Sequence, residues 1–88
     1  MPGDQTQRIT LDPDPPLAGQ KVTICYDFEG LELSETTLRV SFPGTGGTAD
    51  YEVSVNNPCV TIDVPGTATR IAVEDLDGPS PDKQAPVV

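Results

Sequence analysis

Apolar and polar side chains alternate in short segments along most of this 88-residue chain. An alternation with a period of two places every second side chain on the same face of a strand, and segments that recur every roughly 8 to 12 residues are typical of a β-sandwich. None of the segments has the period of a helix. The pattern predicts an all-β fold with strands over residues 8–11, 21–28, 37–42, 50–55, 59–64, 70–75 and 84–88.

The alternation also predicts the core. In each segment the apolar set of alternate positions should face the opposite sheet, and the polar set should face water. The predicted core residues are Ile9, Leu11, Val22, Ile24, Tyr26, Phe28, Leu38, Val40, Phe42, Tyr51, Val53, Val55, Val60, Ile62, Val64, Ile71 and Val73. The last segment contains Pro86 and should lie at a sheet edge, because proline cannot donate a ladder hydrogen bond.

The two cysteines, Cys25 and Cys59, fall on the polar faces of their predicted strands. A buried free cysteine behaves as a small hydrophobe, so this placement calls for a shared explanation. If the two strands are antiparallel neighbours with Cys25 opposite Cys59, the Cα atoms lie roughly 4.5 to 5.5 Å apart, a separation that a disulfide tolerates. We therefore predict a disulfide between them; the alternative is two free thiols in a reducing cytosol.

The same alignment of residues 21–25 with residues 59–63 has favourable partners at its other positions. Hydroxyl pairs, opposite charges and aliphatic pairs all stabilise an antiparallel ladder. The alignment pairs Lys21 with Asp63, Val22 with Ile62, Thr23 with Thr61 and Ile24 with Val60. A shift by one residue would expose the aliphatic set, so the register should be well specified.

Three stretches carry a family resemblance: the proline-rich entry PDPPLAGQKVTI, the segment CVTIDVPG and the segment TRIAVEDLDG. They resemble immunoglobulin-like and fibronectin type III-like domains of secreted and surface proteins over residues 8–88. The resemblance implies a seven-stranded antiparallel immunoglobulin-like β-sandwich with Greek key topology, whose strands are A, B, C, D or C′, E, F and G in chain order. Strands B and E are neighbours in one sheet of that fold, so the predicted disulfide would lie on its outer face.

Two departures from this family are visible. Immunoglobulin domains join strands B and F by a disulfide and pack a tryptophan against it, whereas here the sixth segment has no cysteine and the chain has no tryptophan. The aromatic markers of fibronectin type III domains are also missing. The resemblance therefore concerns architecture.

The length allows one domain at most. We expect a flexible N-terminal segment over residues 1–7 and a single domain over residues 8–88, in which residues 84–88 form either the last edge strand or a flexible tail. The N-terminus lacks the basic and apolar regions of a signal peptide, so an exported protein would contain this chain as a mature or excised fragment.

Charge and composition exclude several functions. Five basic and fourteen acidic residues give a formal net charge of -9, which repels phosphate backbones and anionic lipids, so we expect no nucleic-acid partner. No apolar run approaches the ~20 residues of a membrane-spanning helix, so we expect no membrane insertion. The chain has no histidine and its cysteines are predicted to be oxidised, which excludes the usual nucleophile–histidine arrangements, and we expect no enzyme.

Acidic residues are concentrated in residues 27–35 and 74–82, which the resemblance places at the same end of the sandwich. Carboxylate oxygens are the ligands that Ca²⁺ prefers. A calcium site would use Asp27, Glu29, Asp75, Asp77 and Asp82, with Glu32 and Glu35 nearby. The alternative is a solvated acidic rim that confers solubility.

The glycine-rich run at residues 42–50 lacks the lysine and the helix of a phosphate-binding loop, so we interpret it as a strand connection. We expect the chain to be a non-catalytic module of an extracytoplasmic protein, a spacer, adhesion or protein-binding unit, either monomeric or part of a larger multidomain chain. The partner would be a protein or a cell surface. The alternatives are an accessory carbohydrate- or calcium-binding domain and a small standalone soluble protein of unknown function.

Overall fold

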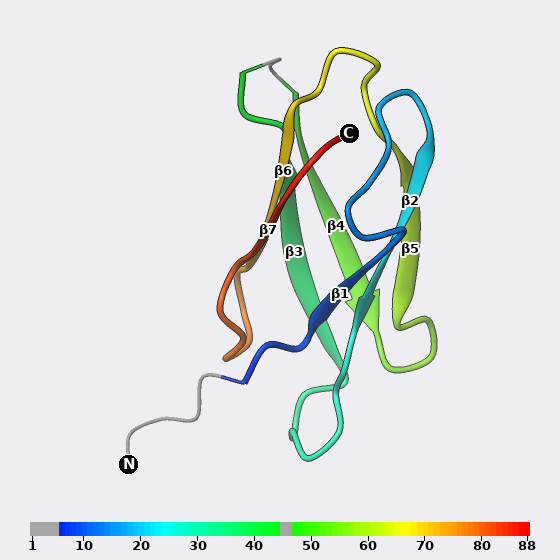
Figure 1. Ribbon diagram of the computed structural model, residues 1–88. Coiled ribbons are helices and arrows are strands. Elements are labelled where there is room, and N and C mark those ends of the chain that lie inside the picture. Colours follow the sequence, from blue (N-terminus) through cyan, green and yellow to red (C-terminus); the bar gives the residue numbers. More distant parts are fainter. Residues whose placement is uncertain (1–5, 45–46) are drawn as a thin grey trace.

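The computed structural model describes residues 6–44 and 47–88 as seven strands in two antiparallel sheets (Figure 1). One sheet has the order β1-β2-β5 and the other has the order β4-β3-β6-β7. The strands are β1 (Ile9–Asp12), β2 (Lys21–Tyr26), β3 (Glu35–Ser41), β4 (Thr48–Ser54), β5 (Cys59–Asp63), β6 (Arg70–Asp75) and β7 (Lys83–Pro86). The all-β prediction is confirmed. The described residues include no helix that could cross a membrane.

The core lies between the two sheets, where the alternation predicts it. The buried apolar residues are Ile9, Leu11, Val22, Ile24, Tyr26, Leu38, Val40, Phe42, Val53, Ile62, Val64, Ala68, Ile71, Val73 and Ala85. Phe28, Tyr51 and Val60 are partly buried and pack against this cluster. Burial of apolar surface at about 25 cal/mol per Å² is the main force that holds the two sheets together.

One predicted core residue, Val55, is instead exposed over 54% of its surface. The predicted strand ran to residue 55, but β4 ends at Ser54, where the chain turns and Asn57 donates a backbone hydrogen bond to the Ser54 carbonyl. Val55 therefore lies beyond the point at which the period-two alternation applies. The third strand also begins earlier than predicted, at Glu35, because Glu35 and Thr36 pair with the last residues of β4.

The predicted register between β2 and β5 is confirmed at all five positions, from Lys21 opposite Asp63 to Cys25 opposite Cys59. On the polar face, Lys21 Nζ lies 2.7 Å from Asp63 Oδ1, and the hydroxyl oxygens of Thr23 and Thr61 are 2.9 Å apart. The ion pair is exposed, so it contributes less than about 1 kcal/mol to stability. Its main effect is to favour this register of β2 and β5 over registers shifted along the ladder.

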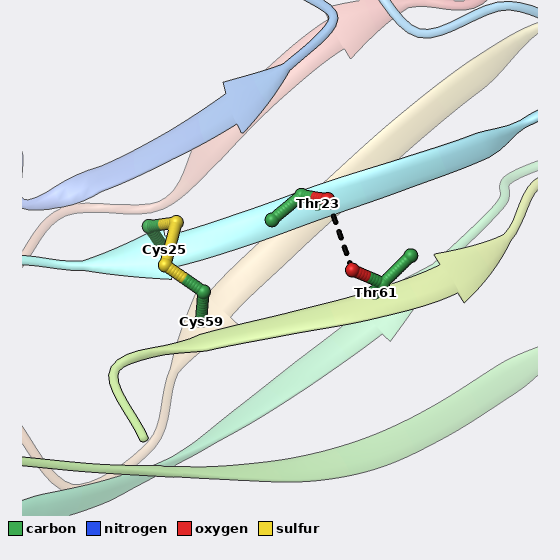
Figure 2. Close-up of a disulfide and its surroundings, with 4 residues drawn as sticks. All are labelled: Thr23, Cys25, Cys59 and Thr61. Atoms are coloured by element: carbon green, nitrogen blue, oxygen red, sulfur yellow. Dashed lines mark hydrogen bonds between the residues drawn. A yellow bond between two sulfur atoms is a disulfide. The ribbon is translucent and has the colours of Figure 1, made fainter. Parts of the chain in front are cut away.

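The Cys25–Cys59 disulfide is present and projects from the same face of the sheet as the threonine pair (Figure 2). Hydrogen bonds from Tyr26 N to the Pro58 carbonyl and from Val64 N to the Gln20 carbonyl set the phase of the ladder. Both cysteines consequently occupy a non-hydrogen-bonded position, where opposed residues approach most closely. Their Cα atoms are 4.0 Å apart, closer than the separation we expected.

Contacts beyond the ladders close one side of the sandwich. Val88 N donates to the Pro16 carbonyl and Ala18 N donates to the Val88 carbonyl, which joins the end of the chain to the segment that follows β1 (Figure 1). Lys83 on β7 forms an ion pair with Asp14 at 3.1 Å. The outer strand of one sheet is thereby connected to the outer strand of the other.

We predict that replacing both cysteines by alanine lowers the free energy of unfolding by about 3 to 4 kcal/mol, because the disulfide closes a loop between residues 34 positions apart and restricts the unfolded chain. Urea denaturation of the oxidised protein and of the double variant measures the difference. The reduced wild-type protein is the control, and it should match the variant. A difference below about 1 kcal/mol would contradict this account.

Candidate functional site

The 27–34 loop and the 76–82 loop lie at one end of the sandwich, as the resemblance implied. The first loop follows β2 and the second follows β6, and a hydrogen bond joins the last residues of these two strands, Tyr26 and Asp75. Because β2 and β6 belong to different sheets, this contact crosses the sandwich. The hydrogen-bonding cluster around it is the most concentrated polar arrangement among the described residues.

Asp75 accepts four hydrogen bonds. Its Oδ2 atom accepts from the Tyr26 hydroxyl at 2.5 Å and from the Ser80 amide at 3.1 Å. Its Oδ1 atom accepts from the Thr36 hydroxyl at 2.6 Å and from the Gly78 amide at 2.9 Å. The carboxylate thus joins β2, β3, β6 and the 76–82 loop. We name these five residues the Asp75 cluster.

The alternation along two strands explains the position of the Asp75 cluster. Asp75 shares the inner face of β6 with Val73, and Thr36 shares the inner face of β3 with Leu38. Both polar side chains therefore point between the sheets, where each needs a hydrogen-bonding partner. Tyr26 supplies one partner, since its ring is buried and its hydroxyl reaches Asp75. Sequence reasoning placed Tyr26 in the core but did not pair it with Asp75.

Burial and hydrogen bonding act on the two titratable groups of the cluster in different ways. Burial alone would raise the pKa of the Asp75 carboxyl, but the hydrogen bonds from Thr36, Tyr26, Gly78 and Ser80 together outweigh it and hold the pKa below its ordinary value. Burial, the hydrogen bond to Asp75 and the charge of Asp75 all raise the pKa of Tyr26 well above its ordinary value. At neutral pH the cluster is therefore a charged acceptor surrounded by neutral donors.

The cluster extends to the N-terminal segment through Ser80. The Ser80 hydroxyl accepts a hydrogen bond from the Arg8 amide at 3.0 Å and lies 3.1 Å from Gln7 Oε1. Gln7 also donates through Nε2 to the Asp82 carbonyl and accepts from the Ile9 amide. Gln7 is thus tied to the fold, although it belongs to the segment 1–7 that we expected to be flexible. Residues 1–5 of that segment lie outside the described residues.

The candidate calcium ligands in the 27–34 loop already have other contacts. Arg8 Nη1 donates to the backbone carbonyls of Asp27 at 2.9 Å and Glu29 at 2.7 Å. The Asp27 side chain accepts a hydrogen bond from the Glu29 amide. A guanidinium therefore lies where the loop carbonyls could otherwise face a metal ion.

The remaining candidate ligands do not converge with these. Asp77 and Asp82 are exposed, and Asp75 uses both oxygens for the cluster. Across residues 6–44 and 47–88, no group of three or more acidic or cysteine side chains is arranged to hold a metal ion. The calcium prediction thus finds no support in the side-chain geometry.

The remaining predictions concern a carbohydrate-binding surface and the glycine-rich strand connection. All four aromatic side chains are in the described part; Tyr26 and Phe42 are buried, and Phe28 and Tyr51 are partly buried against the core. No pocket is found within the described residues. The glycine-rich run at residues 42–50 includes Thr45 and Gly46, which lie outside the described residues.

Comparison with known proteins gives no relative: a scan of protein-family models, a search of the curated proteins and a search of the solved structures each found no match.

We predict that Gly78→Ala destabilises the protein by about 1 to 3 kcal/mol, because a Cβ atom at this position would lie 2.5 Å from Asp75 Oδ2 and 2.6 Å from the Tyr26 hydroxyl. Gly66→Ala is the matched control, since no atom lies within 4 Å of its added Cβ. Thermal and urea unfolding compare the two variants. Equal effects at both positions would show that the crowding at Gly78 has no consequence.

We predict that the Asp75 cluster makes stability depend on pH at both extremes. The folded-state pKa of Asp75 is lowered, so its contribution is complete above about pH 4 and is lost as the pH falls further. The folded-state pKa of Tyr26 is raised, so its contribution is complete below about pH 10 and is lost as the pH rises further. The unfolding free energy, measured from pH 2 to pH 11, should therefore be constant between about pH 4 and about pH 10 and should decrease below and above that range.

The variant Asp75→Asn isolates the acidic limb of that profile. It replaces one acceptor by a donor and should cost about 1 to 3 kcal/mol at pH 7, and it should lose stability less steeply than the wild type below pH 4. Asp77→Asn, at an exposed position with the same chemistry, is the control and should follow the wild-type profile. An Asp75→Asn profile parallel to the wild type would contradict the assignment.

Proposed function

We propose that this chain is a non-catalytic immunoglobulin-like module of a secreted or surface protein, which acts as a spacer, adhesion or protein-binding unit. The observation that carries the proposal is the strand order. Strands β1, β2 and β5 correspond to A, B and E, and strands β3, β6 and β7 correspond to C, F and G. Strand β4 pairs with β3, so it corresponds to C′ in preference to D.

The disulfide supports the extracytoplasmic part of the proposal. Structural disulfides persist in oxidising compartments and are rare in the cytosol, where thiols are kept reduced. A domain of this size also buries a small core, so a covalent link makes a large contribution to its stability. Cys25 and Cys59 are the only cysteines of the chain, and both are used in the bridge.

The shape of the described surface supports a contact role over a catalytic one. Proteins that bind partners without chemistry use flat faces, loops or strand edges, whereas small-molecule sites need a concave pocket with convergent polar groups. The Asp75 cluster is the one convergent polar group we find in the described part, and its donors and acceptors satisfy one another. A carbohydrate-binding role would call for exposed aromatic side chains, and none of the four is exposed.

Alkylation of thiols during native isolation tests the compartment. Cells that produce the protein are lysed in iodoacetamide, and the intact mass is measured before and after reduction. We expect no alkyl group before reduction and two after reduction and a second alkylation. Two alkyl groups on the natively isolated protein would contradict both the oxidising compartment and the module proposed here.

A further inference from the structure

Strand β4 (Thr48–Ser54) forms an open edge of the four-stranded sheet. It is the longest of the four edge strands; β1 and β7 have four residues each and β5 has five. The edge of β7 contains Pro86, and the chain end beside it is joined to the segment after β1. The edge of β4 has no such cover at Thr48, Asp50 and Glu52, which are exposed, whereas at its C-terminal end the Ser54 amide donates to the Asn57 carbonyl of the following turn.

The phase of the ladder shows which backbone groups of β4 are directed outward. Val55 donates to the Ser34 carbonyl and Phe42 donates to the Gly47 carbonyl, so odd-numbered residues of β4 bond to β3. Hydrogen-bonding groups alternate between the two sides of an antiparallel strand. The N–H and C=O groups of Thr48, Asp50 and Glu52 therefore point away from β3, toward the open edge.

The two faces of this edge differ in chemistry. Asp50 and Glu52 lie on the outer face, beside Arg39 of the neighbouring strand. Ala49 and Tyr51 lie on the inner face, opposite the core residues of β3, yet Ala49 is exposed and Tyr51 is only partly buried. The sheet that faces them has three strands against four, so the inner side of β4 is incompletely covered.

The outer face has more negative than positive charge. Arg39 lies 3.6 Å from Asp50 and 3.5 Å from Glu74, so one guanidinium is shared, and Glu52 forms no ion pair with any described residue. All five Lys and Arg side chains lie in the described residues, and each already has an internal partner. Arg8 contacts loop carbonyls, Lys21 contacts Asp63, Arg39 contacts Asp50 and Glu74, Arg70 contacts Gln84 and Lys83 contacts Asp14.

These charges determine what can pair with the edge. A second copy of the chain would place its own Asp50 and Glu52 beside the same residues of the first copy, and like charges on directly opposed residues destabilise a ladder. Acidic side chains on an edge strand in this way prevent self-association. A strand with positive charges would instead be attracted, both by the edge itself and by the net charge of -9.

We propose that the β4 edge binds an extended cationic segment of a partner protein, which adds to the four-stranded sheet as a fifth strand. Its Lys or Arg side chains, two residues apart, lie beside Asp50 and Glu52, and its intervening apolar side chains cover Ala49 and Tyr51. Main-chain hydrogen bonds to Thr48, Asp50 and Glu52 hold the strand. The inference rests on the proposed function and specifies the surface and the partner of a protein-binding module.

The probe is a capped peptide of alternating lysine and valine, six residues long, titrated into the oxidised full chain. Binding is followed by NMR and by calorimetry. We expect saturable binding, with slowed amide exchange at Thr48, Asp50 and Glu52. The control is a second peptide of the same sequence whose backbone nitrogens are methylated on the edge that would face β4. It keeps its charge but cannot form the ladder. Its affinity should be at least about tenfold weaker.

The charge requirement is tested by paired variants of the protein. Asp50→Lys with Glu52→Lys replaces two favourable cross-strand pairs by repulsion and should weaken binding about tenfold or more. Glu32→Lys with Asp77→Lys makes the same change in net charge at exposed loop positions and should weaken binding less than about threefold at 0.15 M salt. Circular dichroism verifies that both variants are folded.

The proposal is overturned if the unmodified peptide does not bind below about 1 mM, if the N-methylated peptide binds as well, or if the two double variants weaken binding equally. The last two results would indicate diffuse electrostatic attraction without strand addition. None of these results bears on the thiol state of the native protein. An intact disulfide with no peptide binding would refute the β4 edge and leave the proposed module in place.

Discussion

The carboxylate of Asp75 is the polar interaction on which one end of this sandwich depends. Two sheets packed face to face are held mainly by apolar contacts, which are non-directional. Asp75 adds direction, because its four donors come from both sheets and from the 76–82 loop. The hydroxyl of Ser80 extends this hydrogen-bonded network to the Gln7 side chain and the Arg8 amide. A single acidic side chain thus links the two sheets and anchors the 76–82 loop at this end of the sandwich.

Other constraints fix the parts of the fold that Asp75 does not reach. The disulfide and the threonine pair align β2 with β5, and the contacts between Val88 and the segment after β1 close one side. The opposite side, at β4, stays open. The architecture is therefore asymmetric: hydrogen bonds and an ion pair close the side that has the short edges of β1 and β7, and acidic side chains line the longer edge of β4.

Much of this fold follows from the period-two alternation. The alternation predicted the Cys25–Cys59 bridge and its register, because every pair of opposed residues agreed with a single alignment of the two strands. It failed at Val55, since a strand end is set by the turn that follows it and by the extent of the facing sheet. The alternation also indicates the orientation of Asp75, which is in phase with Ile71 and Val73 and therefore has to point inward. Whether an inward carboxylate binds a metal or a hydroxyl depends on distant residues, here Tyr26 and Thr36, and the sequence does not show which of them meet.

The position of the disulfide has a mechanical consequence. The bridge encloses β3, β4 and their connections within a covalent loop whose ends are 34 residues apart. If the chain is stretched from its two ends, these residues cannot extend, and the contour length that unfolding releases falls by roughly 110 to 120 Å. Tension passes from β2 to β5 through the sulfur atoms, while β3 and β4 carry none of it directly. The open edge strand therefore lies in the one part of the domain that is shielded from extension under load.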